Sequence, residues 1–471
     1  MASITFDKAN GGLDVRRGPS VSEANRLRQA DNVYITTGGN LQKRPCLTKV
    51  ATLEAGTVGL IAGNGVLNTF YGDVYTTITH ANTFFKSNLV SHNLITPQTT
   101  KVHFGEVFNG FLYVAVEYSN GSILHHYLDG TTPTRIVDAN CPNTKEVIKQ
   151  QSKIYAKGNQ NVRYCATNIP RDWTAANDAG FLPTGVQAIG STTCTALGQF
   201  GKSKLTVFSE DGIQVWSVDP NPSLNAIDSI VPNIGTRYSK SPIGFGGDIF
   251  FLSDQGYRSI TVSNQTDNLR DVDIGSAIDL SVLPTLTASS DPISVFYAGL
   301  GQFWSIDGNT VWVYSFSRTA KLSAWSKFIL PITVNDRAVL NGNLYLRSGD
   351  TVYVMDKDVF TDDGAVPTVT IEMPFLDFKT PGVLKQITGV DTIGIGNATL
   401  KLKYLAMVNG VPTEFISQEI PIISNNTTAP GTMTAVEICA TAVAPIITHS
   451  SNQDFRLDSL TFYYQDLSFD I

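Results

Sequence analysis

Ser209-Glu-Asp-Gly-Ile-Gln-Val-Trp216 and Ser305-Ile-Asp-Gly-Asn-Thr-Val-Trp312 share the pattern Ser-x-Asp-Gly-x-x-x-Trp. Asp-Gly between alternating apolar segments is a strong signal for a tight β-hairpin, because both turn residues need positive φ. Related hairpins are expected at residues 252–262 and 346–356. The sequence therefore predicts an all-β chain with a recurring hairpin, whose structural turns include Asp211, Gly212, Asp307 and Gly308.

The strands that lead these hairpins recur at nearly regular intervals. Successive starting points are 45, 42, 51, 44, 54 and 41 residues apart, and they lie near Leu67, Leu112, Ile154, Leu205, Ile249, Phe303 and Leu344. Repeats of about 40–50 residues are typical of the four-stranded blades of a β-propeller. We therefore expect a β-propeller-like domain of about six or seven blades over residues 52–360. Residues 1–51 are expected to form an N-terminal arm and a first strand.

The last part of the chain has a different pattern. After Asp358 the chain crosses a polar turn, and six alternating strands follow in residues 361–471. Many short strands separated by turns fit a β-sandwich, which we expect as the C-terminal domain. Helical periodicity is scarce, and the candidates are residues 20–30, where Ser20 and Glu23 have capping-box spacing, and residues 275–283.

Charge is low overall and unevenly distributed. Charged residues make up 16% of the chain, and the net charge is −7. Residues 361–471 contain 5 basic and 12 acidic residues, whereas residues 1–360 contain 29 of each. An acidic balance does not support binding to DNA or RNA by release of counterions. Any nucleic acid that meets this protein is therefore expected to pass by without sequence readout.

The cysteines and the N-terminus indicate no special processing. The five cysteines contain no Cys-x-x-Cys pair, so neither a disulfide framework nor a zinc site is predicted for Cys46, Cys141, Cys165, Cys194 and Cys439. The first residues lack the apolar core of a signal peptide, and no stretch approaches 18 uninterrupted apolar residues. Synthesis in the cytoplasm is expected.

Candidate catalytic residues have a structural interpretation that we favour. The carboxylates of Asp211, Asp254, Asp307 and Asp350 could serve a propeller glycosidase, but each is expected in a hairpin turn, where aspartate bonds to nearby backbone. The repeated pattern also differs from the sialidase Asp-box by one glycine position. The histidines are scattered, and His125 and His126 should point to opposite faces of one strand. No catalytic, metal or cofactor-binding residue is predicted.

The aromatic strands allow two interpretations. Trp304 and Trp312 are expected on one face of their hairpin, packed between blades, where each ring would bury roughly 150–250 Å². Aromatic-rich strands could alternatively form sugar platforms, as in lectins.

The N-terminal region contains the one local cluster of basic residues, and Arg16, Arg17, Arg26 and Arg28 are candidate assembly contacts. Lys43 and Arg44 belong to the same cluster in the sequence. A solvated arm is the alternative. The cluster could also meet DNA or an acidic partner ring. We favour contact with a neighbouring subunit or with an adjoining partner ring, because the rest of this region is nearly neutral.

Three motifs near the N-terminus are Gly11-Gly-Leu-Asp-Val15, Ala30-Asp-Asn-Val-Tyr34 and Gly39-Asn-Leu-Gln-Lys-Arg-Pro45. They resemble the opening of tail nozzle (tail hub) proteins of short-tailed, podovirus-type bacteriophages. Residues 277–280, 294–304, 311–328 and 342–356 resemble the later propeller portion of that family. The resemblance implies a structural turn at Lys43, Arg44 and Pro45, and Cys46 stands where many relatives have glycine.

The resemblance also implies a function. Members are structural virion proteins, not enzymes, that form a homohexameric ring and extend the DNA-ejection conduit below the portal. The expected partners are the head-to-tail adaptor ring above, tail fibre or tail plug and needle proteins, and viral DNA that passes through. The expected location is the virion tail, after synthesis in the bacterial host cytoplasm. The alternative is a carbohydrate-binding or glycan-cleaving β-propeller of a phage receptor-binding protein.

Overall fold

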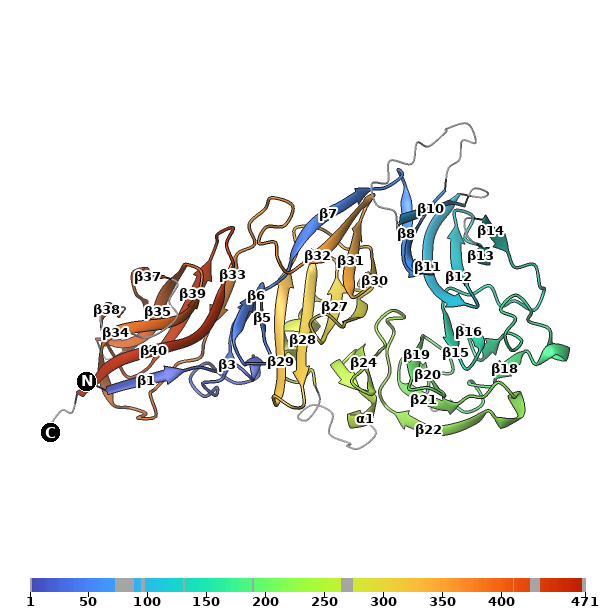
Figure 1. The fold of residues 1–471 in the computed structure, drawn as a ribbon. Helices are drawn as coiled ribbons and strands as arrows, with labels where there is room; N and C mark the ends of the chain where they lie inside the picture. Colours follow the sequence, from blue (N-terminus) through green and yellow to red (C-terminus); the bar gives the residue numbers. More distant parts are fainter. Residues whose placement is uncertain are drawn as a thin grey trace.

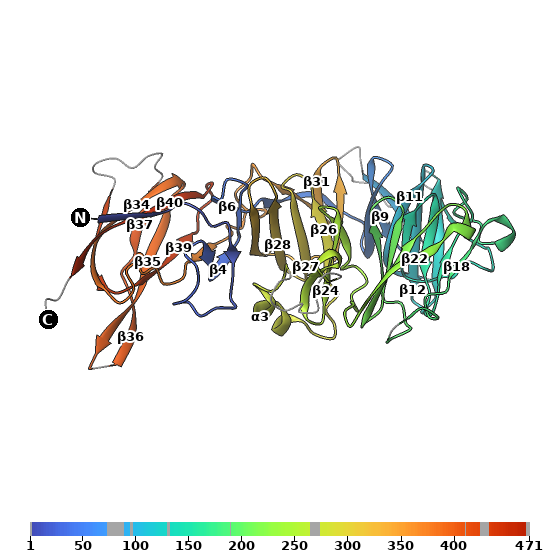
Figure 2. The ribbon, with the colours of Figure 1, turned by 90° about the horizontal axis from the view of Figure 1, so that it is seen from below.

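The computed structural model describes residues 2–72, 89–94, 98–129, 132–188, 190–263, 274–409, 411–423 and 433–467. Its regular structure is almost entirely β (Figure 1), which confirms the all-β class expected from the sequence. Helical segments in the described part are single turns: α1 (Ile260–Ser263), α3 (Asp279–Val282), η1 (Ala175–Asn177), η2 (Pro222–Leu224) and η3 (Leu283–Thr285). The molecule is elongated, and residues 2–6 lie beside the last described strand (Figures 1 and 2).

Seven groups of neighbouring strands form the propeller-like part within the described residues. The first four groups are β8 (Thr57–Gly63), β9 (Val66–Tyr71) and β10 (Leu89–Asn93); β11 (Thr99–Phe108), β12 (Phe111–Tyr118), β13 (Ile123–Asp129) and β14 (Thr132–Arg135); β15 (Val147–Gln150), β16 (Lys153–Lys157), β17 (Val162–Tyr164) and β18 (Gly180–Leu182); and β19 (Ala196–Phe200), β20 (Lys204–Phe208), β21 (Gly212–Ser217) and β22 (Ala226–Pro232).

The remaining three groups complete this part of the chain. They are β23 (Ile243–Phe245), β24 (Asp248–Ser253) and β25 (Gly256–Ser259); β26 (Ile293–Tyr297), β27 (Gln302–Asp307), β28 (Thr310–Ser317) and β29 (Leu322–Ile329); and β30 (Asp336–Leu340), β31 (Asn343–Ser348) and β32 (Thr351–Asp356) with β7 (Cys46–Thr52). Each of the seven leading strands expected from the spacing coincides with the second strand of one group: β9, β12, β16, β20, β24, β27 and β31.

The first strands of the seven groups surround a common cavity. Each first strand contacts the first strand of the next group, and β30 of the last group contacts β8 of the first. Side chains from all seven line one cavity of about 500 Å³. The last group is completed by β7, which runs antiparallel to β32 although some 300 residues separate them. The N-terminal and C-terminal edges of the propeller-like part are joined by this pairing.

The C-terminal strands form two sheets that pack face to face. One contains β38 (Thr434–Ala440), β34 (Leu384–Ile395), β40 (Arg456–Leu467), β6 (Leu41–Lys43) and β5 (Val33–Ile35), with β1 (Ala2–Phe6) paired to β40. The other contains β33 (Val369–Glu372), β39 (Val443–His449), β35 (Ala398–Val408), β36 (Val411–Ile416) and β37 (Ile420–Ile422). Apolar side chains of both sheets share one core, which is the β-sandwich arrangement.

The N-terminal segment lies between the two parts, although the sequence suggested an arm. Strand β4 (Gln29–Asp31) pairs with β29 of the propeller-like part on one side and with β33 of the sandwich on the other. One continuous sheet therefore runs through both parts. Two-residue strands β2 (Gly12–Leu13) and β3 (Arg26–Leu27) pair in parallel beside it. The edges of β29 and β33 would otherwise carry unpaired backbone groups.

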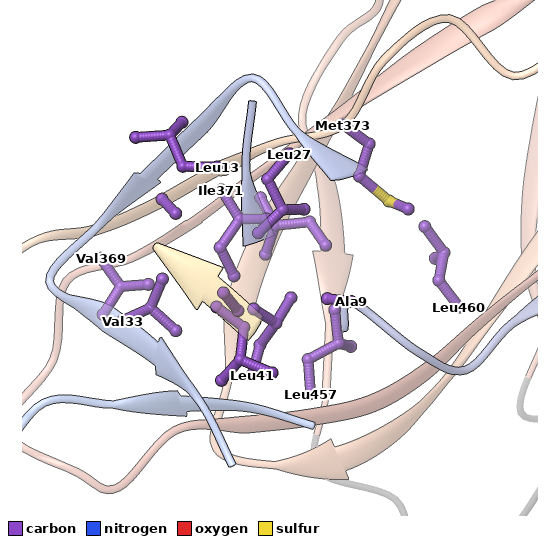
Figure 3. Close-up of a cluster of buried hydrophobic side chains, with 14 of the residues drawn as sticks. Ala9, Leu13, Leu27, Val33, Leu41, Val369, Ile371, Met373, Leu457 and Leu460 are labelled. Carbon is purple, nitrogen blue, oxygen red and sulfur yellow. The ribbon is translucent and has the colours of Figure 1, made fainter. Parts of the chain in front are cut away.

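We call the region where the N-terminal segment connects the propeller-like part to the sandwich the joint. Apolar side chains fill it (Figure 3). Buried residues of the N-terminal segment pack against buried residues of the sandwich, and the labelled set comprises Ala9, Leu13, Leu27, Val33, Leu41, Val369, Ile371, Met373, Leu457 and Leu460. Removing such side chains from water contributes roughly 25 cal/mol per Å² of apolar area. The joint is therefore part of the largest core of the molecule.

The Lys-Arg-Pro segment is a buried connection between two strands, so the structural turn that the resemblance implied is wrong. Lys43 ends β6, and Arg44 and Pro45 lead directly into β7. The Lys43 ammonium donates hydrogen bonds to the carbonyl oxygens of Phe360, Ser451 and Gln453 at 2.9–3.1 Å. These acceptors lie far away in the sequence, which is why the local pattern did not reveal that the segment is buried.

Arg44 forms the central polar contact of the joint. Its guanidinium donates to both carboxylate oxygens of Asp362, with Nη1 2.9 Å from Oδ1, and both side chains are almost fully buried. Arg44 Nε donates to Asn32 Oδ1 at 2.9 Å, and Asp362 Oδ1 also accepts from the Leu47 backbone at 2.8 Å. The pair connects the N-terminal segment to the start of the C-terminal part.

Two local predictions are wrong for tertiary reasons. Residues 20–30 form no helix, because residues 26–31 supply strands β3 and β4. Trp304 and Trp312 lie on opposite faces, because the turn pairs Trp304 with Val313 and Trp312 with Ser305. Their side chains accordingly belong to different cores. The short helix expected within 275–283 is confirmed as α3.

Replacing Asp362 by asparagine should strongly destabilise the protein. Asp362→Asn leaves the buried Arg44 charge without its anion, which typically costs about 3–5 kcal/mol in the free energy of unfolding. The measurement is chemical denaturation followed by tryptophan fluorescence. The control is Asp228→Asn, which breaks an exposed pair with Lys204 at 2.7 Å and should change the free energy by under about 1 kcal/mol. Equal effects of the two changes would contradict a structural role for the Arg44 pair.

Candidate functional site

The Asp-Gly pairs lie in hairpins, but their backbone differs from the expected type. Gly212 already belongs to β21, and neither Asp211 nor Gly212 adopts positive φ. In the second copy Gly308 has φ of 61°, whereas Asp307 still pairs with Thr310 as the end of β27. Strand pairing thus extends further into both turns than the dipeptide alone indicates.

The four aspartates considered as catalytic carboxylates lie in hairpins of four different sheets. Asp211 Oδ1 accepts a hydrogen bond from the Ser191 backbone at 2.8 Å, and Asp350 Oδ1 accepts one from the Thr57 backbone at 2.8 Å. Asp254 pairs with Arg237 at 3.3 Å on the surface. The observed contacts of Asp211 and Asp350 are those of residues that hold backbone in place.

The N-terminal arginines surround the buried carboxylate of Asp14. Arg16 Nη2 lies 2.8 Å from Asp14 Oδ2, and Arg26 Nη1 lies 3.8 Å from the same oxygen. Burial opposes ionisation of Asp14, but hydrogen bonds and charge from Arg16, together with the Arg26 charge, outweigh it and lower the Asp14 pKa. Arg28 Nη1 donates to the backbone oxygens of Asp14 and Arg17.

These contacts change the interpretation of the basic cluster. Arg16, Arg26 and Arg28 hold the N-terminal loops together, and Lys43 and Arg44 are buried elsewhere in the joint. Arg17 differs, because its side chain is 54% exposed and pairs only at 3.4 Å with Glu23, which is equally exposed. Arg17 is therefore the member of this set best placed to meet another molecule.

Two adjacent histidines contact tyrosine hydroxyls. His125 bonds to the Tyr113 hydroxyl at 2.8 Å and His126 to the Tyr118 hydroxyl at 2.7 Å, on opposite faces of β13 as expected. Burial lowers the pKa of both to about 4. His80 lies outside the described residues. Within the described ranges no three His, Cys, Asp or Glu side chains gather as metal ligands, and all five cysteines are free.

The central cavity is a site that the sequence did not reveal. Its wall contains ionisable side chains from several different strands and loops: Glu106, Glu146, Lys240, Asp336 and Arg337. His103, whose pKa burial lowers to about 4, and the aromatic residues Phe104 and Phe296 also line it. These positions are scattered over more than 200 residues, and the ring of first strands brings them together. The only local signal is polar side chains at inward positions of otherwise apolar strands, as in residues 102–108 and 336–340.

Two of the cavity carboxylates have partners behind the wall. Asp336 Oδ2 accepts hydrogen bonds from Arg347 Nε and Nη2 at 2.8 and 2.6 Å. Glu146 Oε1 accepts from the Leu197 backbone at 2.6 Å, and Glu146 Oε2 lies 3.4 Å from Lys157 Nζ. Each of these carboxylates thus has a cationic neighbour, although burial still raises the pKa of Asp336, and raises that of Glu146 to about 7.

Glu106 has a different environment. It projects from β11 among cavity-lining side chains and is half-buried. Burial raises the pKa of Glu106 to about 7, and a hydrogen bond from the Lys149 backbone, together with the charges of Lys149 and Arg337, only partly offsets this effect. Lys240 and Arg337 also line the cavity, the Lys240 side chain is largely buried, and burial lowers the pKa of each.

A second candidate site is the β35–β36 hairpin, which projects from the sandwich in Figure 2. On one face the pairs Tyr404–Phe415 and Val408–Val411 form an apolar ladder, with the two aromatic rings stacked at 5.8 Å. Val411 is 61% exposed, and Ile416 on the other face is 55% exposed. Contiguous exposed apolar side chains of this kind mark interaction surfaces.

No family model matches this chain, and no curated protein matches it. Among solved structures it is similar to the extracellular domain of a one-component system protein from B. thetaiotaomicron, with 10% identity and a TM-score of 0.41 over 75% of this chain. This chain spans 43% of the length of that structure.

Two other solved structures are similar at the same low level. A chain of the mitotic checkpoint complex has 11% identity and a TM-score of 0.36 over 75% of this chain and 90% of its own length. The AfRom2 CNH domain has 11% identity and a TM-score of 0.33 over 58% and 90%. These similarities carry no information about function. No described helix has the length and apolar character needed to cross a lipid bilayer.

The raised pKa of Glu106 should make stability depend on pH. Glutamate in the unfolded chain titrates near 4.5, so between about pH 4.5 and 7 the folded state holds a proton that the unfolded state has lost. The contribution of this proton is complete below pH 4.5 and is lost as the pH rises to 7. Glu106→Gln abolishes this loss, so the stability of the variant relative to wild type should rise by about 1–3 kcal/mol from pH 5 to pH 7.5.

Chemical denaturation of both proteins at several pH values measures this difference. The control is Glu210→Gln, which changes an exposed carboxylate and should give a stability difference that is constant over the same range. A constant difference for Glu106→Gln as well would show that Glu106 titrates normally.

Proposed function

We propose that this chain is the nozzle (hub) subunit of a short-tailed bacteriophage tail, a structural virion protein that assembles into a homohexameric ring. The ring would extend the DNA-ejection conduit below the portal and adaptor ring, and would carry fibres or a plug. The observation that carries this proposal is the exposed apolar β35–β36 hairpin on a two-part body whose halves share one continuous sheet. The N-terminal motifs that resemble nozzle proteins support the same assignment.

The hairpin suits a contact between subunits. A closed ring of identical subunits needs two different surfaces that meet head to tail. Val408, Val411 and Phe415 give the hairpin an apolar ladder that water solvates poorly, and an adjacent subunit would cover it. A body with a continuous sheet across its joint favours closure, because a flexible joint would let successive subunits adopt different angles.

The size of the central cavity restricts where the conduit can lie. The cavity inside one chain measures about 500 Å³, and duplex DNA is wider than its major groove, which alone is about 12 Å across. In the proposed assembly the DNA therefore passes between subunits and not through the propeller-like part of any one of them. An acidic balance in residues 361–471 is compatible with this role, since a mildly negative wall does not retain a polyanion.

Changing the hairpin tests the proposal. Val411→Asp places a charge on the apolar ladder and should raise the protein concentration needed for ring assembly about tenfold or more, which corresponds to at least 1.4 kcal/mol. The measurement is mass by light scattering and negative-stain imaging, with the chain alone and with an adaptor-bearing portal complex.

The matched control is Val186→Asp, which changes a valine that is 82% exposed in a loop of the propeller-like part. It should leave assembly unchanged. Wild-type chain that stays monomeric both alone and on the portal complex would overturn the nozzle assignment. Rings that form normally with Val411→Asp would instead exclude the hairpin from the contact.

A further inference from the structure

The central cavity has the properties of a ligand site that the nozzle function does not require. Its volume of about 500 Å³ falls within the 300–1,000 Å³ typical of small-molecule pockets. All seven first strands contribute to its wall, and two of its charged residues, Glu106 and Arg337, lie on strands β11 and β30. Strands position their side chains more precisely than loops. Lys240 lies in the turn that precedes β23.

The charges that face this space are not balanced within the wall. Asp336 and Glu146 are paired with Arg347 and Lys157 behind the wall. Lys240 Nζ lies 3.9 Å from Asp336, which is beyond hydrogen-bond distance, and 5.9 Å from the centre of the Phe104 ring. Arg337 donates through Nε to the Ser294 backbone at 3.1 Å. In the described part of the chain, the Arg337 Nη atoms and Lys240 Nζ have no hydrogen-bond acceptor.

Glu106 is the remaining carboxylate. Among the described residues it has no ion pair within 4 Å, although Arg337 is close enough for their charges to interact. Two cations and one carboxylate thus share the cavity with open hydrogen-bonding capacity. Phe104 and Phe296 add apolar faces beside them. The combination offers an anion two donors, offers a hydroxyl group one strong acceptor, and offers the carbon skeleton an aromatic surface.

We propose that the central cavity binds a hydroxylated anion of monosaccharide size, a sugar acid or a sugar phosphate. The anionic group lies between Lys240 and Arg337, where charge-assisted hydrogen bonds are strongest. A ligand hydroxyl donates to the Glu106 carboxylate, and the ring of the ligand packs against Phe104 or Phe296. This site lies inside one chain, so it does not depend on ring assembly and is separate from the nozzle proposal.

Isothermal titration calorimetry on the purified full chain at pH 7.5 tests the site. The probes are glucuronate and glucose 6-phosphate, with neutral glucose and inorganic phosphate for comparison. We expect saturable binding at one site per chain for at least one of the two hydroxylated anions, at least tenfold tighter than for glucose and for phosphate. If only glucuronate binds, the ligand is a sugar acid, and if only glucose 6-phosphate binds, it is a sugar phosphate.

Variants of the wall test the roles of the groups. Lys240→Gln and Arg337→Gln should each weaken binding of that anion at least tenfold, and Glu106→Gln should remove most of the preference over inorganic phosphate. Arg337 also bonds to the Ser294 backbone, so Lys240→Gln keeps the test decisive if Arg337→Gln does not fold. The control is Lys204→Gln, which removes an exposed lysine and should leave binding unchanged.

Two results would overturn the proposal. One is the absence of saturable binding of both hydroxylated anions at millimolar concentration, and the other is binding that Lys240→Gln, in a protein with normal circular dichroism, leaves intact. Because the measurement works on monomers, failure here does not bear on ring assembly, and a monomeric protein could still bind the anion.

Discussion

The buried contact between Arg44 and Asp362 is the constraint on which the arrangement of this molecule depends. A guanidinium removed from water is tolerated only when an anion and further acceptors surround it, and here Asp362, Asn32 and the Pro45 carbonyl fill that role. The carboxylate belongs to the chain that enters the sandwich, whereas Arg44 lies just before the strand that completes the last propeller sheet. Both parts must therefore be in place before either charge is satisfied.

Strand β4 has the same effect through the backbone. Its three residues pair with β33 on one side, and Asp31 also pairs with Lys327 of β29 on the other, so that backbone pairing and an apolar core cross the boundary together. A boundary joined in this way differs from a flexible linker, since separating the parts would expose paired backbone and apolar surface at once. A body of this kind is suited to present distant surfaces at a constant angle.

The two candidate sites differ in chemistry: one is an exposed apolar surface, and the other is a cavity lined by charged side chains. The hairpin offers apolar side chains to water, which favours contact with another protein surface. The central cavity gathers charged groups, among them Glu106, Lys240 and Arg337, and is the place where we propose that an anion binds. The seven-strand ring provides the second site, and the edge of the sandwich provides the first.

The sequence by itself determined the class of fold and the repeat. Local alternation of apolar residues placed all seven leading strands from Leu67 to Leu344, because strand formation here follows short-range patterns. The buried role of Arg44, the strands at residues 26–31 and the faces of Trp304 and Trp312 were decided only by the tertiary structure. Each depends on a partner elsewhere in the fold or on the register of a turn: Asp362, β29 with β33, and the pairing of β27 with β28. The cavity follows the same rule, since only closing the circle of first strands brings Glu106 and Arg337 to one space.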